Sequence, residues 1–206
     1  MLFNFGGESE IRTHDRLAPM PVFKTGAFNR SAISPFSIDF PCKIVYYSIL
    51  HMSNNNFEIQ HITFEQIQSI WKENLWPSRE TNEIKTHSSM KFMQGYDMKI
   101  YESIATYFSI VNNGKIVAVN SGFQTAKYEY RSRGLFVFPE YRKRGIGKQI
   151  LLATIEQAVK ERSRLIWSFP RTNSLQTYQS VGFVQCSEII YEDVISGPNC
   201  YVKLEL

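Results

Sequence analysis

The chain has 206 residues, of which 43% are hydrophobic and 14% aromatic, and its formal net charge at pH 7 is +4. This length and composition suit one globular domain with a sizeable core and some excess chain. No run approaches the roughly 18 consecutive apolar residues that indicate a membrane-spanning helix. The three scattered cysteines fit neither a disulfide framework nor a zinc site, and the small charge excess does not require a nucleic-acid partner.

The start of the chain lacks the pattern of a folded domain. Residues 1–40 show neither the period of a helix nor that of a strand. Gly6–Leu17 and Pro21–Ala32 resemble the conceptual translation of the reverse strand of a bacterial serine tRNA gene, because an Ile-Arg-Thr run can encode the complement of the T-loop. We expect residues 1–51 to be a non-native or disordered extension and the native chain to begin at Met52. The alternative is a genuine flexible extension, such as a targeting segment.

The next part of the chain is more regular. Phe57–Ile62 predicts a first strand, and a capping box at Thr63–Gln66 begins a helix that runs to about Glu73. Residues 78–100 are polar and irregular, and within them Ser88–Gln94 favours a short helix.

The clearest hairpin of the chain follows. Ala105–Val111 and Ile116–Phe123 are rich in strand-forming residues, and the Asn112–Lys115 segment between them contains an Asn-Gly pair, which is a strong turn signal. Tyr128–Phe138 predicts the next strand.

A basic turn, Pro139–Lys148, joins that strand to an amphipathic helix that runs to about Arg162. A helix start presents unpaired N–H groups and the positive end of the helix dipole, which suits a phosphate, and glycine lets the backbone approach it closely. The spacing Arg142-x-x-Gly145-x-Gly147 is neither a nucleotide P-loop nor a complete dinucleotide fingerprint. The plain alternative is a solvated basic turn.

The C-terminal part predicts one helix and three strands. Leu165–Phe169 is a short buried strand, and a helix that contains Tyr178 ends at Gly182. Val184–Tyr191 and Asn199–Leu206 predict the last two strands.

The basic turn, together with Tyr178 four residues before the Gly182-Phe183 pair, resembles the GNAT N-acetyltransferase family. The resemblance covers about residues 56–206 and implies the acyl-CoA N-acyltransferase fold. That fold is an α/β (α+β) domain in which a mixed, mostly antiparallel sheet has helices on both faces. We therefore expect one such domain at residues 52–206.

The resemblance also implies a function. It implies an N-acetyltransferase that moves an acetyl group by direct transfer from acetyl-CoA, the acyl-donor cosubstrate, to a primary amine. Tyr178 would be the general acid that protonates the departing thiolate, and no metal is implied. The implied cofactor-binding residues are Phe136, Val137, Phe138, Arg142, Lys143, Arg144, Gly145, Ile146, Gly147, Lys148, Arg171 and Asn173.

The chain departs from the family pattern at one position. The family often has Asn seven residues before the tyrosine, where this chain has Arg171, and Asn173 stands two places later. Arg171 is either a phosphate contact, for which its planar cation is suited, or a surface arginine near a helix start. The general base stays open among Glu102, Glu129, Glu140, His61 and His87, and water-mediated deprotonation is a further alternative.

Two competing interpretations remain at this stage. One is a non-catalytic module that binds acyl-CoA as a ligand or regulator, and the other is a basic nucleic-acid-binding domain, which rests only on Arg142–Arg144 and the high pI. We expect neither a nucleic-acid nor a membrane partner. We expect a cytoplasmic monomer or homodimer, since reduced cysteines suit that compartment.

Overall fold

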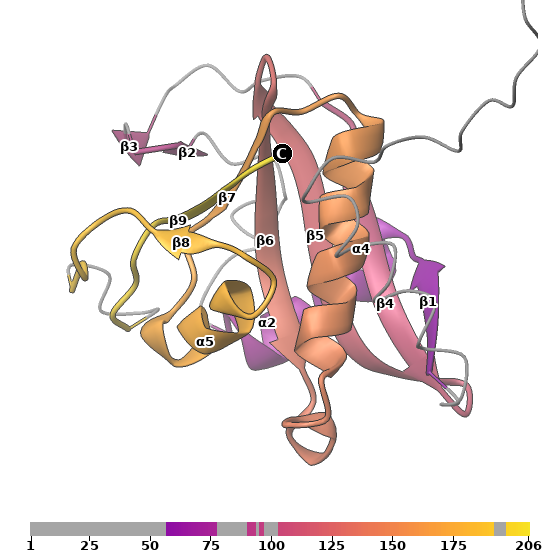
Figure 1. Ribbon diagram of the computed structural model, residues 1–206. Helices are drawn as coiled ribbons and strands as arrows, with labels where there is room; N and C mark the ends of the chain where they lie inside the picture. Colours follow the sequence, from indigo (N-terminus) through magenta and orange to yellow (C-terminus); the bar gives the residue numbers. More distant parts are fainter. Residues whose placement is uncertain (1–56, 78–89, 94, 97–102, 192–196) are drawn as a thin grey trace, which may run out of the picture. The chain divides into compact units, whose positions relative to one another are not determined.

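The computed structural model describes residues 57–77, 90–93, 95–96, 103–191 and 197–206. One sheet consists, in spatial order, of β1 (Phe57–His61), β4 (Thr106–Asn112), β5 (Lys115–Ala126), β6 (Glu129–Val137), β7 (Leu165–Ser168), β9 (Val202–Glu205) and β8 (Val184–Gln185). Neighbouring strands run antiparallel except β6 and β7, which run parallel. The sheet is therefore mixed and mostly antiparallel, as the sequence predicts (Figure 1).

The predicted hairpin between β4 and β5 is confirmed. Its turn residues Asn113 and Gly114 both have left-handed backbone angles, with φ of 49° and 75°. Two consecutive left-handed residues match the right-handed twist of the flanking strands, which explains the Asn-Gly pair at this position.

The predicted capping box is also confirmed. The helix α2 (Phe64–Asn74) begins after Thr63, whose side chain accepts a hydrogen bond from the Gln66 amide, while the Gln66 side chain accepts one from the Thr63 amide. These reciprocal bonds satisfy donors that a helix start leaves unpaired. The buried face of α2 carries Ile67 and Trp71.

Helices cover both faces of the sheet. The helix α4 (Ile146–Lys160) lies in front of β5 in Figure 1, and α2 lies behind the sheet. Ile146 and Ile150 of α4 pack against Phe108 of β4, whereas the buried residues of α2 pack against Phe136 of β6. The helix ends at Lys160, close to the predicted end at about Arg162, and Val159 in its last turn is 41% exposed.

The chain after α4 is less regular than the sequence predicts. Two short helical segments follow β7, η2 (Thr172–Ser174) and α5 (Leu175–Gln179), and a third, η1 (Pro139–Tyr141), precedes α4. The predicted strand Val184–Tyr191 is two residues long, and beyond it Ile190 forms only an isolated bridge with Asn199. Strand length depends on the partner strand, which local sequence does not specify.

The short helix predicted at Ser88–Gln94 is wrong where it can be checked. Met90–Lys91 forms the strand β2, which pairs with β3 (Gly95–Tyr96) in a separate two-stranded sheet. Residues 88, 89 and 94 lie outside the described residues, as do residues 1–51.

Candidate functional site

The basic turn Pro139–Lys148, which the sequence predicts to bind a phosphate, leads into the start of α4, and we call it the phosphate turn. Gly145 is the N-cap, has φ of 76° and offers no side chain to cap the helix. A Cβ built at this position meets no heavy atom within 4 Å, so the space beside the backbone is open. The first-turn N–H groups have no intrahelical acceptor. They are therefore available to an anion at the positive end of the helix dipole.

Four exposed cations surround this turn: Arg142, Lys143, Arg144 and Lys148. Arg142 also ties the turn to the end of β6, because its Nε donates a 2.9 Å hydrogen bond to the carbonyl oxygen of Val137. Ile146 is buried in the core, so only its backbone can reach a ligand. A Cβ at Gly147 would lie 2.9 Å from the Thr177 side chain, so glycine permits the close contact of α4 with α5.

The strand that leads to the turn separates from its parallel neighbour. Residues Glu129–Arg131 of β6 pair with Leu165–Trp167 of β7, and no pairing is recorded beyond that point although β6 continues to Val137. Figure 1 shows the two strands diverging. We call the open edge of β6 between Ser132 and Val137 the fork.

The backbone of Val137 faces the fork. The Phe138 amide donates a 3.0 Å hydrogen bond to the Val117 carbonyl of β5. Backbone groups of successive strand residues point to opposite sides, so the N–H and C=O of Val137 point away from β5. The contact of its carbonyl with Arg142 agrees with this direction. Among the three predicted strand-end residues, Val137 therefore offers its amide to a ligand, whereas the Phe138 amide is engaged.

A β-bulge produces this arrangement. Val119 pairs with Phe136 and Ser121 pairs with Arg133, so two residues of β6 oppose one residue of β5. Gly134 is the first bulged residue, with φ of 77°, as glycine allows in this kind of bulge. From the other face, the Trp71 indole Nε1 donates a 2.7 Å hydrogen bond to the Gly134 carbonyl.

Tyr178 lies on α5, and its hydroxyl points to the closed end of the fork, which is the end where the pairing of β6 with β7 stops. It is 2% exposed, and its ring meets Phe183 edge to face with 5.3 Å between ring centroids. Its hydroxyl oxygen lies 3.1 Å from the Ser168 Oγ at the end of β7. Burial raises the pKa of the Tyr178 phenol above its ordinary value. The neighbouring hydroxyls of Ser168 and Ser132 act in the opposite direction.

Sequence reasoning missed the residues around this hydroxyl. Ser168 Oγ donates a 2.8 Å hydrogen bond to the Ser132 carbonyl, and the Asn120 side-chain amide donates to both Ser132 Oγ (2.9 Å) and Thr154 Oγ1 (2.8 Å). All four residues are buried. No signal in the sequence joins them, because Ser132 stands in the middle of the predicted strand Tyr128–Phe138 and Ser168 near the end of another, Leu165–Phe169.

Arg171 and Asn173, which are also predicted to bind the cofactor, contact other parts of the chain. Arg171 is half-buried, and its Nη2 donates a 3.0 Å hydrogen bond to the carbonyl of Leu75 at the end of α2. Asn173 is exposed in η2, where its side chain accepts a bond from Ser174. Neither of these contacts is with the phosphate turn, so the cofactor roles of Arg171 and Asn173 stay predictions.

The candidates for general base are dispersed. Glu140 is exposed in η1, and Glu129 stands at the start of β6, where burial raises its pKa. His61 packs edge to face on Phe108. Glu102 and His87 lie outside the described residues.

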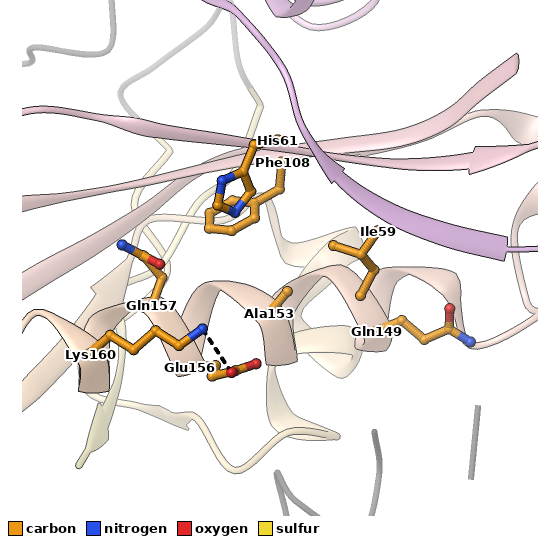
Figure 2. A pocket seen from close by; sticks show the side chains of 8 residues that line it. All are labelled: Ile59, His61, Phe108, Gln149, Ala153, Glu156, Gln157 and Lys160. Carbon is orange, nitrogen blue, oxygen red and sulfur yellow. Dashed lines mark ion pairs between the residues drawn. The ribbon is translucent and has the colours of Figure 1, made fainter. Parts of the chain in front are cut away.

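A separate pocket of about 180 Å³ lies between β1, β4 and α4. Figure 2 shows His61 and Phe108 above it and the Glu156–Lys160 ion pair below it. The lining residues include none of those predicted for the cofactor.

Two absences concern only the part of the chain that the structure describes. No three His, Cys, Asp or Glu side chains gather there as a metal site. In the same residues, no helix is long and apolar enough to cross a membrane.

The sheet with its fork, bulge and phosphate turn is the GNAT fold. An IAA acetyltransferase from Bacillus cereus superposes with a TM-score of 0.55 at 18% identity, over 73% of this chain and 99% of that one. A Salmonella typhimurium structure, titled as an acetyltransferase with its cofactor acetyl-CoA, superposes with a TM-score of 0.56 at 14% identity, over 74% and 95% of the two chains.

The sequence comparisons agree with the fold. Residues 103–185 match the family model of the acetyltransferase (GNAT) domain, which confirms the predicted resemblance over this part of the chain. A UPF0039 protein from Schizosaccharomyces pombe is 31% identical over 96 residues. That match covers 46% of this chain and spans 63% of the length of the relative.

Proposed function

We propose that this protein is an acetyl-CoA-dependent N-acetyltransferase that acts on a primary amine. The observation that carries the proposal is the fork in the sheet. It has an open helix start with four exposed cations at one end and the hydroxyl of Tyr178 at the other.

The residues present fit the cofactor. The open space beside Gly145 admits a pyrophosphate against the first-turn amides of α4, and Arg142, Lys143, Arg144 and Lys148 supply positive charge. The pantetheine arm would lie along the fork, where β6 has no strand partner. The similar Salmonella typhimurium structure is described with its cofactor acetyl-CoA, which supports this assignment. When bound, acetyl-CoA supplies a thioester whose acetyl group passes to an amine and whose sulfur takes up a proton.

Two groups of this chain would perform the chemistry. The Val137 amide faces the fork and would donate to the oxyanion that develops on the thioester carbonyl, which is often a large catalytic contribution. Tyr178 would donate the proton from its hydroxyl to the departing sulfur. Since burial raises the pKa of this phenol, the hydroxyl keeps its proton at neutral pH.

A non-catalytic acyl-CoA-binding module is the second candidate. It would need the phosphate turn but not a proton donor at the closed end of the fork. The hydrogen-bonded position of Tyr178 there favours the enzyme.

The cofactor assignment is tested by thermal unfolding of the full chain. Acetyl-CoA at 100 times its dissociation constant should stabilise the protein by about 2.7 kcal/mol, which corresponds to roughly 5–11 °C for a chain of this size. Gly145→Glu should abolish the shift, because it puts a carboxylate where the pyrophosphate binds.

Gly114→Glu is the matched control. Gly114 has the same left-handed backbone, with φ of 75°, is also exposed and also has open space around it. The Gly114→Glu variant should keep the full rise in melting temperature with acetyl-CoA. Loss of this rise in both variants would contradict the assignment of the turn. Release of free thiol from acetyl-CoA in the presence of a panel of amines then separates an enzyme from a binding module.

A further inference from the structure

We propose that Ser132 and Ser168 form a hydroxyl pair that positions the Tyr178 proton and stabilises the phenolate left when that proton is given away. The inference deepens the proposed function and rests on it for its catalytic meaning. Both serines stand at the closed end of the fork, one residue beyond the last paired residues of β6 and β7. They are 0% and 3% exposed.

The hydrogen-bond partners fix where the protons lie in the resting protein. The Ser168 hydroxyl has one proton and two neighbours, the Ser132 carbonyl at 2.8 Å and the Tyr178 oxygen at 3.1 Å. A carbonyl only accepts, whereas a phenol can also donate. Both contacts are satisfied together when Ser168 donates to the carbonyl and Tyr178 donates to Ser168 Oγ.

Loss of the Tyr178 proton changes this arrangement. The Tyr178 hydroxyl would turn its proton from Ser168 Oγ to the departing sulfur, where the O–H bond breaks and an S–H bond forms. The phenolate can then only accept, so the Ser168 proton turns from the Ser132 carbonyl to the phenolate oxygen. The phenolate regains a proton from solvent, to which the acceptor amine has released its own. One rotation of a hydroxyl therefore provides a donor where negative charge develops.

The second hydroxyl of the pair belongs to Ser132, whose carbonyl oxygen holds Ser168 Oγ at 2.8 Å. Asn120 Nδ2 donates to Ser132 Oγ at 2.9 Å, which holds this oxygen in place and leaves its own proton for another acceptor. The Ser132 hydroxyl, like that of Ser168, lowers the pKa of Tyr178 against the effect of burial.

The lowering of the Tyr178 pKa by the two hydroxyls matters because the proton goes to a thiolate leaving group. A thiol has a pKa of about 8.5 and a phenol one of about 10, and each additional unit makes the proton transfer tenfold less favourable. Burial alone would widen that gap. Hydroxyl donors to the phenolate narrow it, so the two serines keep a buried tyrosine useful as an acid.

The test measures the titration of Tyr178 itself. The full chain is labelled with 3-fluorotyrosine, and the resonance of Tyr178 is assigned by its absence in Tyr178→Phe. Fluorine NMR across a pH series, without cofactor, then gives the midpoint of the Tyr178 titration. Ser168→Ala should raise the midpoint by about one unit, since a hydrogen bond to the charged form is lost, and Ser168→Thr should restore it.

The matched control is Ser121→Ala. Ser121 is equally buried, and its hydroxyl donates a 2.8 Å bond to the Arg133 carbonyl of β6, as Ser168 does to Ser132. It should leave the Tyr178 midpoint unchanged. If Ser168→Ala does not fold, Ser132→Ala carries the same expectation. An unchanged midpoint in the folded variant would overturn the proposal and leave the serines a role in strand packing alone.

Activity gives a separate readout. Ser168→Ala should lower kcat by about threefold to tenfold, the range expected for one unit of pKa in an acid, with the KM for acetyl-CoA unchanged. If the wild-type protein neither binds acetyl-CoA nor releases thiol, the proposed function fails. The titration still tests the hydroxyl pair in that case, so the two failures are distinguishable.

Discussion

Replacement of Gly134 by alanine tests the bulge that shapes the fork. Gly134 has φ of 77°, a left-handed conformation that L residues adopt at a cost. A Cβ at this position would lie 2.4 Å from two carbon atoms of the Trp71 ring. The indole would have to move, although it is fully buried and bonded to the Gly134 carbonyl. The substitution therefore meets two independent penalties at one residue.

Their sum can be worked out. The left-handed backbone costs roughly 1–2 kcal/mol, and overpacking a well-packed core costs about 1–3 kcal/mol. The free energy of unfolding of Gly134→Ala should therefore fall by about 2–5 kcal/mol. One kcal/mol shifts the melting temperature by roughly 2–4 °C in a protein of this size, so the expected loss is about 4–20 °C.

Thermal unfolding followed by circular dichroism measures this loss. Gly114→Ala is the control, since Gly114 has φ of 75° but nothing within 4 Å of its Cβ position. It should show the backbone penalty alone. Trp71→Phe in the Gly134→Ala background should recover part of the difference, because the smaller ring relieves the clash. Equal losses at the two glycines would refute the reasoning that Trp71 presses on the bulge.

Three further predictions concern other parts of the chain. Tyr178→Phe should keep the thermal shift with acetyl-CoA but lower kcat for thiol release by about 10²–10⁴-fold; an unchanged kcat would mean that another group or water protonates the sulfur. Burial and the nearby Glu161 raise the pKa of Tyr130. Its contribution to stability is therefore complete below about pH 10 and is lost as the pH rises through the folded-state pKa. Tyr130→Phe should flatten the alkaline fall of stability in urea unfolding, and a parallel fall would contradict this. A chain that begins at Met52 should keep the melting temperature and activity of the full chain, and a large loss of either would make residues 1–51 a real part of the protein.

The features that depend on neighbours in sequence could be predicted. The capping box at Thr63–Gln66 involves residues three positions apart, and the Asn113-Gly114 turn needs only two residues with left-handed angles. The turn before α4 was also found from its spacing. In each case, one short segment contains both the groups that interact and the backbone that positions them.

The features that sequence reasoning missed depend on contacts between distant residues. Arg171 bonds to Leu75, which lies 96 residues away, and Trp71 bonds to Gly134 at a separation of 63 residues. Ser168 reaches the Ser132 carbonyl across the parallel strands. Such contacts are set by which strands pair and in what register. Hydrophobic pattern and turn chemistry set the register within a hairpin, but a single sequence does not show which distant strands pair, so a polar residue in a strand gave no sign of its partner.

The bulge decides which backbone groups of β6 face the fork. Before it, the Ser132 carbonyl points to β7, where Ser168 donates to it, and the Arg133 carbonyl points to β5, where Ser121 donates to it. Even-numbered residues thus face the fork at this end. After the bulge, the Phe138 amide points to β5 and Val137 faces the fork instead. The extra residue therefore reverses the alternation of the strand, which brings the Val137 amide to the same side as the Ser132 carbonyl. An unbulged β6 would turn the Val137 amide toward β5, away from the edge where Tyr178 and the start of α4 are found.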